Sequence, residues 1–107
     1  MINETHDTYQ YLKPKSDSFS KSDIIIPGKE PIDIILDLNH LNGINNSLLG
    51  IILDLNKDQI SKGFCLVVVK SDITDFSRRD SLIVVPTLGE AKDYIQMEKI
   101  QRDLGFI

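Results

Sequence analysis

The clearest pattern along the chain is a set of three short apolar runs. They cover residues 32–38, 66–69 and 82–85. None of them shows the polar alternation of a half-exposed strand, and this is typical of strands that are buried on both faces of a sheet. A further short strand is expected at residues 24–26, where a Pro-Gly pair ends another apolar run.

Two long helices are predicted, one between the first two runs and one after the third. The first helix covers residues 46–62, with Asn45 or Asn46 as its N-cap and Gly63 at its end. The second runs from Leu88 to about Asp103 and begins in a capping box, Thr87-Leu88-Gly89-Glu90. The first helix joins two strands as a βαβ unit, for which a right-handed crossover is expected.

These elements predict an α/β fold of one domain, residues 1–107. We expect a mixed sheet of four or five strands covered by the two long helices, with short helical turns between residues 71 and 80. Residues 1–23 are polar and uneven, so they are interpreted as an irregular N-terminal segment in which residues 8–12 form at most a short strand. A chain of 107 residues is close to the commonest size of a single domain.

The second helix carries apolar residues on two sides. At 100° per residue, Leu88, Ala91 and Ile95 lie on one face, and Met97, Ile100 and Leu104 lie on roughly the opposite face. One straight helix cannot bury both stripes on one sheet. We expect the first stripe to face the sheet and the second to contact the N-terminal segment or another chain; the alternative is a kink that returns it to the core.

Composition and charge narrow the classes of function. The formal net charge is −4, which disfavours a nucleic-acid partner. No apolar run approaches the length of a membrane span, and the first residues do not resemble a secretory signal. The single cysteine, Cys65, rules out an intramolecular disulfide and fits a reducing compartment. We therefore expect a cytoplasmic protein that binds neither membrane nor nucleic acid.

Chemistry-bearing residues do not converge in the sequence. His6, His40 and Cys65 lie far apart, so no metal site is expected. Asp37, His40 and Ser47 are close in sequence, but they lack the strained Gly-x-Ser-x-Gly turn of a serine hydrolase. Neither an enzyme nor a cofactor is predicted. Ser47 at the start of a helix is either a capping residue or a phosphorylation site facing free amides and the positive end of the helix dipole.

The residues around Ser47 resemble a known motif. A strand ending in Leu36-Asp37-Leu38 leads through a short loop to Asn45-Asn46-Ser47-Leu48-Leu49-Gly50. This is similar to the signature of STAS domains, the anti-sigma factor antagonist family, in which Asp-Ser-Ser-Gly-Leu-Gly opens a helix. The resemblance continues through residues 62–69 and 85–91, and residues 97–104 look like the tail of a STAS branch common in Bacteroidetes.

The resemblance implies a function in a bacterial regulatory pathway. Ser47 falls on the serine that a partner kinase phosphorylates in such proteins. The implied partner is an anti-sigma factor or switch kinase, and the implied interface comprises Asn42, Asn45, Asn46, Ser47, Leu48 and Leu49. The chain departs from the motif at three positions, because Asn45, Asn46 and Leu48 replace Asp, Ser and Gly. It resembles a trimmed or divergent member of the family.

Two alternatives stay open beside a phosphorylation switch. The altered motif favours a constitutive scaffold subunit, without phosphorylation, that docks through Met97, Ile100 and Leu104 of the last helix. A homo-oligomer is compatible with that alternative. A small-ligand-binding domain is the other alternative, and no convergent site in the sequence supports it.

Overall fold

The computed structural model describes residues 2–15, 32–41, 43–71 and 82–105. The elements follow one another as β1 (Ile2–Thr5), β2 (Tyr9–Lys13), β3 (Asp33–Asp37), α1 (Asn46–Ser61), β4 (Leu66–Val69), β5 (Ile83–Val85) and α2 (Leu88–Asp103). The five strands of the described segments form one mixed sheet in the order β1-β2-β3-β4-β5, and among them only β1 runs antiparallel to its neighbour. The predicted α/β class is confirmed.

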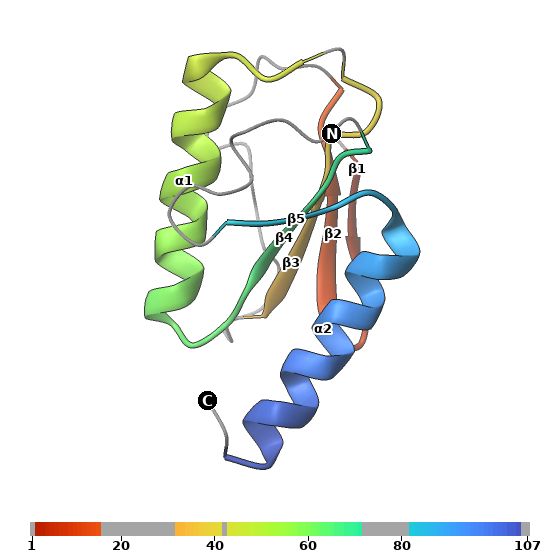
Figure 1. Cartoon of the computed structure of the whole chain (residues 1–107), viewed down its shortest axis with the longest axis vertical. Coiled ribbons are helices and arrows are strands. Elements are labelled where there is room, and N and C mark those ends of the chain that lie inside the picture. Colours follow the sequence, from red (N-terminus) through yellow and green to blue (C-terminus); the bar gives the residue numbers. More distant parts are fainter. Residues whose placement is uncertain (1, 16–31, 42, 72–81, 106–107) are drawn as a thin grey trace.

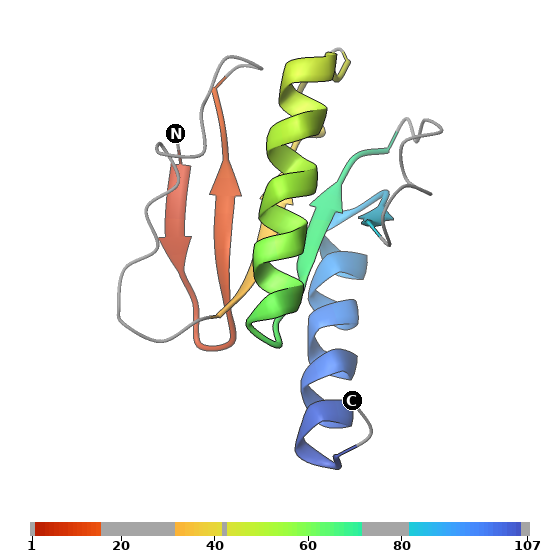
Figure 2. The same ribbon diagram turned by 90° about the vertical axis from the view of Figure 1, so that its left-hand side faces the viewer.

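One helix covers each face of the sheet, as Figure 1 shows with the sheet nearly edge-on. Successive residues of a strand point to opposite faces, and this divides the core in two. On one face Ile34, Leu36, Leu66 and Val68 pack with Leu48 and Ile52 of α1. On the other face Ile35, Val67 and Val69 pack with Ala91 and Ile95 of α2. The view turned by 90° shows α1 lying across one face of the sheet (Figure 2).

The bounds of both helices follow from the capping residues in the sequence. The side chain of Asn45 accepts a hydrogen bond from the Leu48 amide, and Thr87 Oγ1 accepts one from the Glu90 amide. At the end of α1, Gly63 has a φ of +83°, a left-handed conformation that glycine adopts without a Cβ clash. The predicted starts and ends of both helices are therefore confirmed to within a residue.

The structure corrects two expectations about strands. The N-terminal part is not irregular over its described residues: Ile2–Thr5 and Tyr9–Lys13 form an antiparallel hairpin, in which Gln10 bonds to Asn3 and Thr5. In the run at residues 82–85, Leu82 is buried but Ile83–Val85 are only half-buried, and β5 lies at an edge of the described sheet. The strand predicted at residues 24–26 and the helical turns predicted around residues 73–76 lie outside the described residues.

A buried ion pair fixes the C-terminal turn of α2 to the start of β3. Both oxygens of Asp33 accept hydrogen bonds from Arg102 Nη2, at 2.8 and 2.7 Å, and Oδ1 also accepts the Cys65 amide at 2.9 Å. The Asp33 side chain is 3% exposed and that of Arg102 21%. The guanidinium also lies over the Phe64 ring, 4.9 Å from its centroid. Asp33 thus joins β3, β4 and α2.

We predict that Arg102→Met lowers the free energy of unfolding by about 3 kcal/mol, because the Asp33 carboxylate stays buried without its counter-charge. Urea denaturation followed by circular dichroism measures this loss. Lys99→Met is the matched control, since it breaks the exposed Lys99–Asp103 pair of the same helix and should cost less than about 0.5 kcal/mol. Equal losses in the two variants would show that Asp33–Arg102 is no more important than a surface pair.

Candidate functional site

The predicted interface lies at the carboxyl end of the parallel strands, where β3 passes into α1. Asp37, the last residue of β3, accepts a hydrogen bond from the Tyr11 hydroxyl at 2.5 Å and one from the Asn39 amide at 3.1 Å. Asn39 Oδ1 in turn accepts the Ser71 amide at 2.7 Å. The pKa of Tyr11 is raised above its usual range, first by burial and then by Asp37. This hydroxyl therefore stays protonated and keeps donating to the carboxylate.

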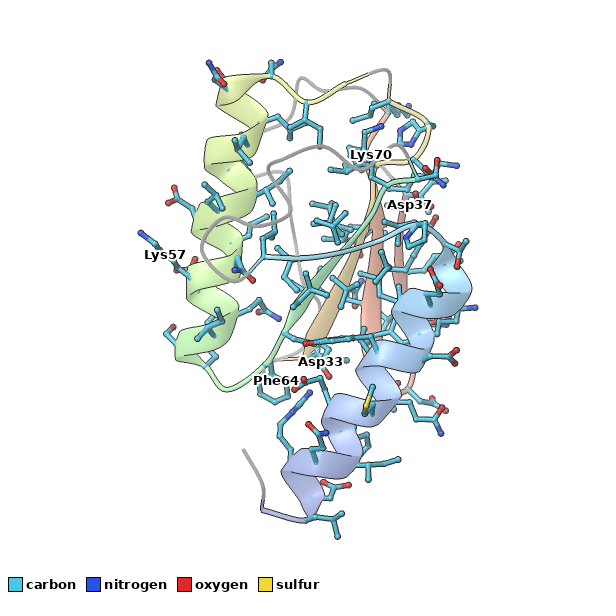
Figure 3. The ribbon with its side chains drawn as sticks, in the orientation of Figure 1. Asp33, Asp37, Lys57, Phe64 and Lys70 are labelled. Atoms are coloured by element: carbon cyan, nitrogen blue, oxygen red, sulfur yellow. The ribbon has the colours of Figure 1, made fainter. Side chains whose placement is uncertain are left out.

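Lys70 also holds the loop between β3 and α1 in position. Its side chain is almost completely buried at the end of β4, and Nζ donates to the Leu41 carbonyl at 2.7 Å. Figure 3 shows Lys70 and Asp37 at the same end of the sheet. The His40 ring forms a hydrogen bond with the Pro14 carbonyl of the segment after β2. The loop is thus tied to both neighbouring strands, so the start of α1 has a fixed position.

The first turn of α1 has the geometry expected of a capped helix. Asn45 is extended, with φ −78° and ψ 170°, and its Oδ1 accepts the Leu48 amide at 2.8 Å. Its carbonyl accepts the Leu49 amide at 3.0 Å. The expectation that Asn45 bonds a backbone amide at the helix start is confirmed. Ser47 is the second helical residue, and it is exposed rather than acting as the cap.

The structure separates the residues that were predicted to contact a partner. Asn45, Asn46 and Ser47 are exposed, and Leu49 is half-buried. Leu48 is fully buried in the core beneath α1, so its inclusion among the contact residues is wrong. The physical reason is helical geometry: position 48 lies on the sheet-facing side of α1, with Ile52 and Leu55 below it. Asn42 lies outside the described residues.

Electrostatics at this helix start favour an anion. The first turn of α1 contains no acidic side chain, so none compensates the positive end of the helix dipole. The amides of Asn46 and Ser47 come before the Leu49 amide, which donates to the Asn45 carbonyl, and the first amides of a helix are left open to solvent or to a ligand. A phosphate on Ser47 would lie beside these groups. The helix start therefore tolerates a negative charge that a helix interior would not favour.

The second predicted interface lies on the outer side of α2. Met97, Ile100 and Leu104 are 53%, 51% and 62% exposed, whereas Ala91 and Ile95 of the same helix are buried against the sheet. The helix is continuous from Leu88 to Asp103, so the alternative of a kink that returns this stripe to the core is wrong. Contact of the stripe with another chain stays a prediction.

Within the described segments, no hydrogen bond joins Asp37, His40 and Ser47 to one another. The side-chain hydrogen bonds of Asp37 and His40 are directed to Tyr11, Asn39 and Pro14. Burial raises the pKa of the Cys65 thiol well above its usual range, which keeps it protonated. Among the described residues, no three His, Cys, Asp or Glu side chains are placed to hold a metal ion.

A search of protein-family models and of curated proteins finds no match to this chain. Within the described segments, neither helix combines the length and apolar character needed to cross a bilayer.

We predict that Asn45→Ala lowers the free energy of unfolding by about 1 kcal/mol, because the Leu48 amide loses its acceptor. Asn46→Ala is the matched control, since Asn46 is exposed on the first helical position and alanine favours a helix. Thermal and urea denaturation measure both variants. Overlapping curves for Asn45→Ala and the unmodified chain would contradict the capping role.

Proposed function

We propose that this chain is a protein–protein interaction module of the anti-sigma factor antagonist type, acting in a bacterial cytoplasm. The observation that carries the proposal is the exposed position of Ser47 on a helix start that is held in place by Asn45, Lys70 and Asp37. A fixed surface around a modifiable serine is what a phosphorylation-controlled binding module needs. The resemblance of residues 34–53 to STAS domains supports the same function.

The mechanism is occlusion of a partner surface. Asn45, Asn46 and Ser47 form the exposed part of the contact, and the half-buried Leu49 adds apolar area. A phosphate on Ser47 would bring up to two negative charges to this surface, which already lacks any basic side chain in the first turn of α1. A partner that packs closely on Ser47 would then have to bury an unpaired charge. The partner implied by the resemblance is an anti-sigma factor or a switch kinase.

A second candidate function is supported by the outer side of α2. Met97, Ile100 and Leu104 recur at helical spacing and are half or more exposed. Apolar anchors at i, i+3 and i+7 are typical of a helix that docks into a groove of another protein. A constitutive scaffold that binds through this stripe would not need Ser47 to be modified.

We predict that Ser47→Asp weakens binding of the captured partner about tenfold, because the added carboxylate has no counter-charge in the interface. Its free energy of unfolding should change by less than about 1 kcal/mol, since an acidic residue in the first turn of a helix is favourable. The partner is first captured from an extract of the source bacterium on the immobilised chain, and affinity is then measured by calorimetry.

Ser47→Asn is the matched control for this experiment, because it changes the side chain at the same position without adding charge. It should retain the affinity of the unmodified chain within about twofold, a difference of roughly 0.4 kcal/mol. Equal affinities for Ser47→Asp and Ser47→Asn would rule out the charge switch and favour the constitutive scaffold.

We further predict that changing Ile100 and Leu104 together to Lys leaves the fold intact, since both side chains are already exposed. The double change should abolish any association that depends on α2, whether with a second copy or with a partner. Analytical ultracentrifugation and denaturation measure the two properties. Ile95→Lys is the contrasting variant and should unfold the chain, because Ile95 is buried against the sheet. Unfolding of the Ile100/Leu104 variant would show that these residues belong to the core.

A further inference from the structure

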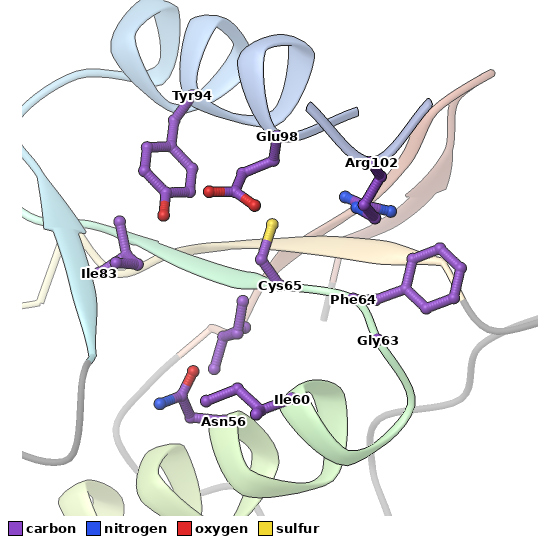
Figure 4. A pocket seen from close by; sticks show the side chains of 10 residues that line it. Asn56, Ile60, Gly63, Phe64, Cys65, Ile83, Tyr94, Glu98 and Arg102 are labelled. Carbon is purple, nitrogen blue, oxygen red and sulfur yellow. The ribbon is translucent and has the colours of Figure 1, made fainter. Parts of the chain in front are cut away.

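A cavity lies at the opposite end of the sheet from Ser47, between the last turns of α1, the start of β4 and α2 (Figure 4). Its volume is about 280 Å³. Ile60, Phe64, Leu66 and Ile83 form its apolar wall, and Tyr94 and Glu98 reach it from α2. Ile60 is 55% exposed, so the cavity is accessible from solvent beside this residue.

The charges around the cavity leave a surplus carboxylate. Arg102 is bound to both oxygens of Asp33, at 2.8 and 2.7 Å, and these two charges compensate each other. Glu98 also lines the cavity, one helical turn before Arg102, and forms no ion pair with a residue in the described segments. Asp33 lies next to this wall rather than in it, and Asp33, Arg102 and Glu98 together carry one net negative charge, which favours a cation over an anion at this end of the described sheet.

The other polar groups of the cavity are neutral at physiological pH. Burial, followed by the charge of Glu98, raises the pKa of Tyr94 to about 12. Burial also raises the pKa of the Cys65 thiol. Figure 4 shows the Tyr94 hydroxyl and the Cys65 sulfur on either side of the Glu98 carboxylate. Among the described residues of the wall, Glu98 is consequently the one ionised side chain besides Arg102, whose charge is paired with Asp33. Glu98 also forms a side-chain hydrogen bond with Tyr94.

We infer that this cavity is a binding site for a small organic cation, a primary amine on an apolar body of about ten heavy atoms. The ammonium group would lie at Glu98, and the body would pack against Ile60, Leu66 and Ile83. The size follows from the volume, which holds about nine groups the size of a water molecule. The rings of Phe64 and Tyr94 add favourable contacts for a cation or an aromatic body. This inference does not depend on Ser47 or on any protein partner.

Phenethylamine is a suitable probe, and 3-phenylpropionate is its matched control because it has the same ring and a similar length with the opposite charge. Both are titrated into the full chain uniformly labelled with ¹⁵N, and amide shifts are recorded by two-dimensional NMR. We expect saturable shifts with phenethylamine that concentrate at Phe64–Leu66 and Tyr94–Glu98. The propionate should bind at least tenfold more weakly.

Two variants assign the binding to Glu98. Glu98→Gln should weaken phenethylamine binding about tenfold, the loss expected for one charge-assisted hydrogen bond. Glu90→Gln removes the same charge from an exposed position of the same helix and should leave the affinity unchanged within twofold. For each variant, amides far from the substituted residue should keep the positions that they have in the spectrum of the unmodified chain, and this shows that the variant has folded.

Three results would overturn the inference. They are the absence of saturable shifts up to the solubility limit of the amine, equal binding of the propionate, and equal weakening by Glu98→Gln and Glu90→Gln. The last result would show only general attraction of a cation to an acidic chain. None of these outcomes bears on the proposed function, because the probe site and Ser47 lie at opposite ends of α1.

Discussion

The ion pair of Asp33 with Arg102 holds together parts of the chain that apolar packing alone joins weakly. The helix α1 buries Leu48, Ile52 and Leu55 against the sheet, whereas α2 buries only Ala91 and Ile95 completely. Leu88 and Tyr94 add partly buried contacts in the first half of α2, but Met97, Ile100 and Leu104 are exposed, so apolar packing does not fix its last turns. Asp33 compensates for this by binding the last turn of α2 and the Cys65 amide at the same time. The paired carboxylate of Asp33 therefore fixes the last turn of α2 to the start of β3.

The sequence predicted those parts of the fold that depend on local rules. The apolar runs of β3 and β4, the Asn45 and Thr87 caps and Gly63 each act within a few residues, so their outcome could be worked out without tertiary structure. The hairpin of β1 and β2 could not, because Ile2–Thr5 is exposed along its whole length and has no apolar pattern. The segment forms a strand because its backbone pairs with β2. The pair of Asp33 with Arg102, 69 residues apart, was equally inaccessible.

At the candidate site too, the features that depend on neighbouring residues were predicted, and those that depend on tertiary packing were not. The position of Ser47 in the first turn of α1 followed from the capping residue beside it. The burial of Leu48 did not, because it depends on which side of α1 meets the sheet. The supporting residues Lys70 and Tyr11 were also missed. For Lys70 the sequence held one signal, a lysine directly after the apolar run of β4. A charged side chain at such a buried position has to reach a hydrogen-bond partner or solvent, and Lys70 reaches the Leu41 carbonyl.

The distance between the two proposed sites determines how they can influence each other. From Ser47 to Ile60 the axis of α1 rises by about 20 Å. This is about two and a half times the screening length at physiological ionic strength, so a phosphate on Ser47 changes the potential at Glu98 very little through solvent. Coupling would require a movement of α1 as a body. Leu48 in the core at one end, and Gln59 bonded to the Ile32 and Cys65 carbonyls at the other, oppose that movement. The two sites should therefore bind independently, each responding to its own ligand.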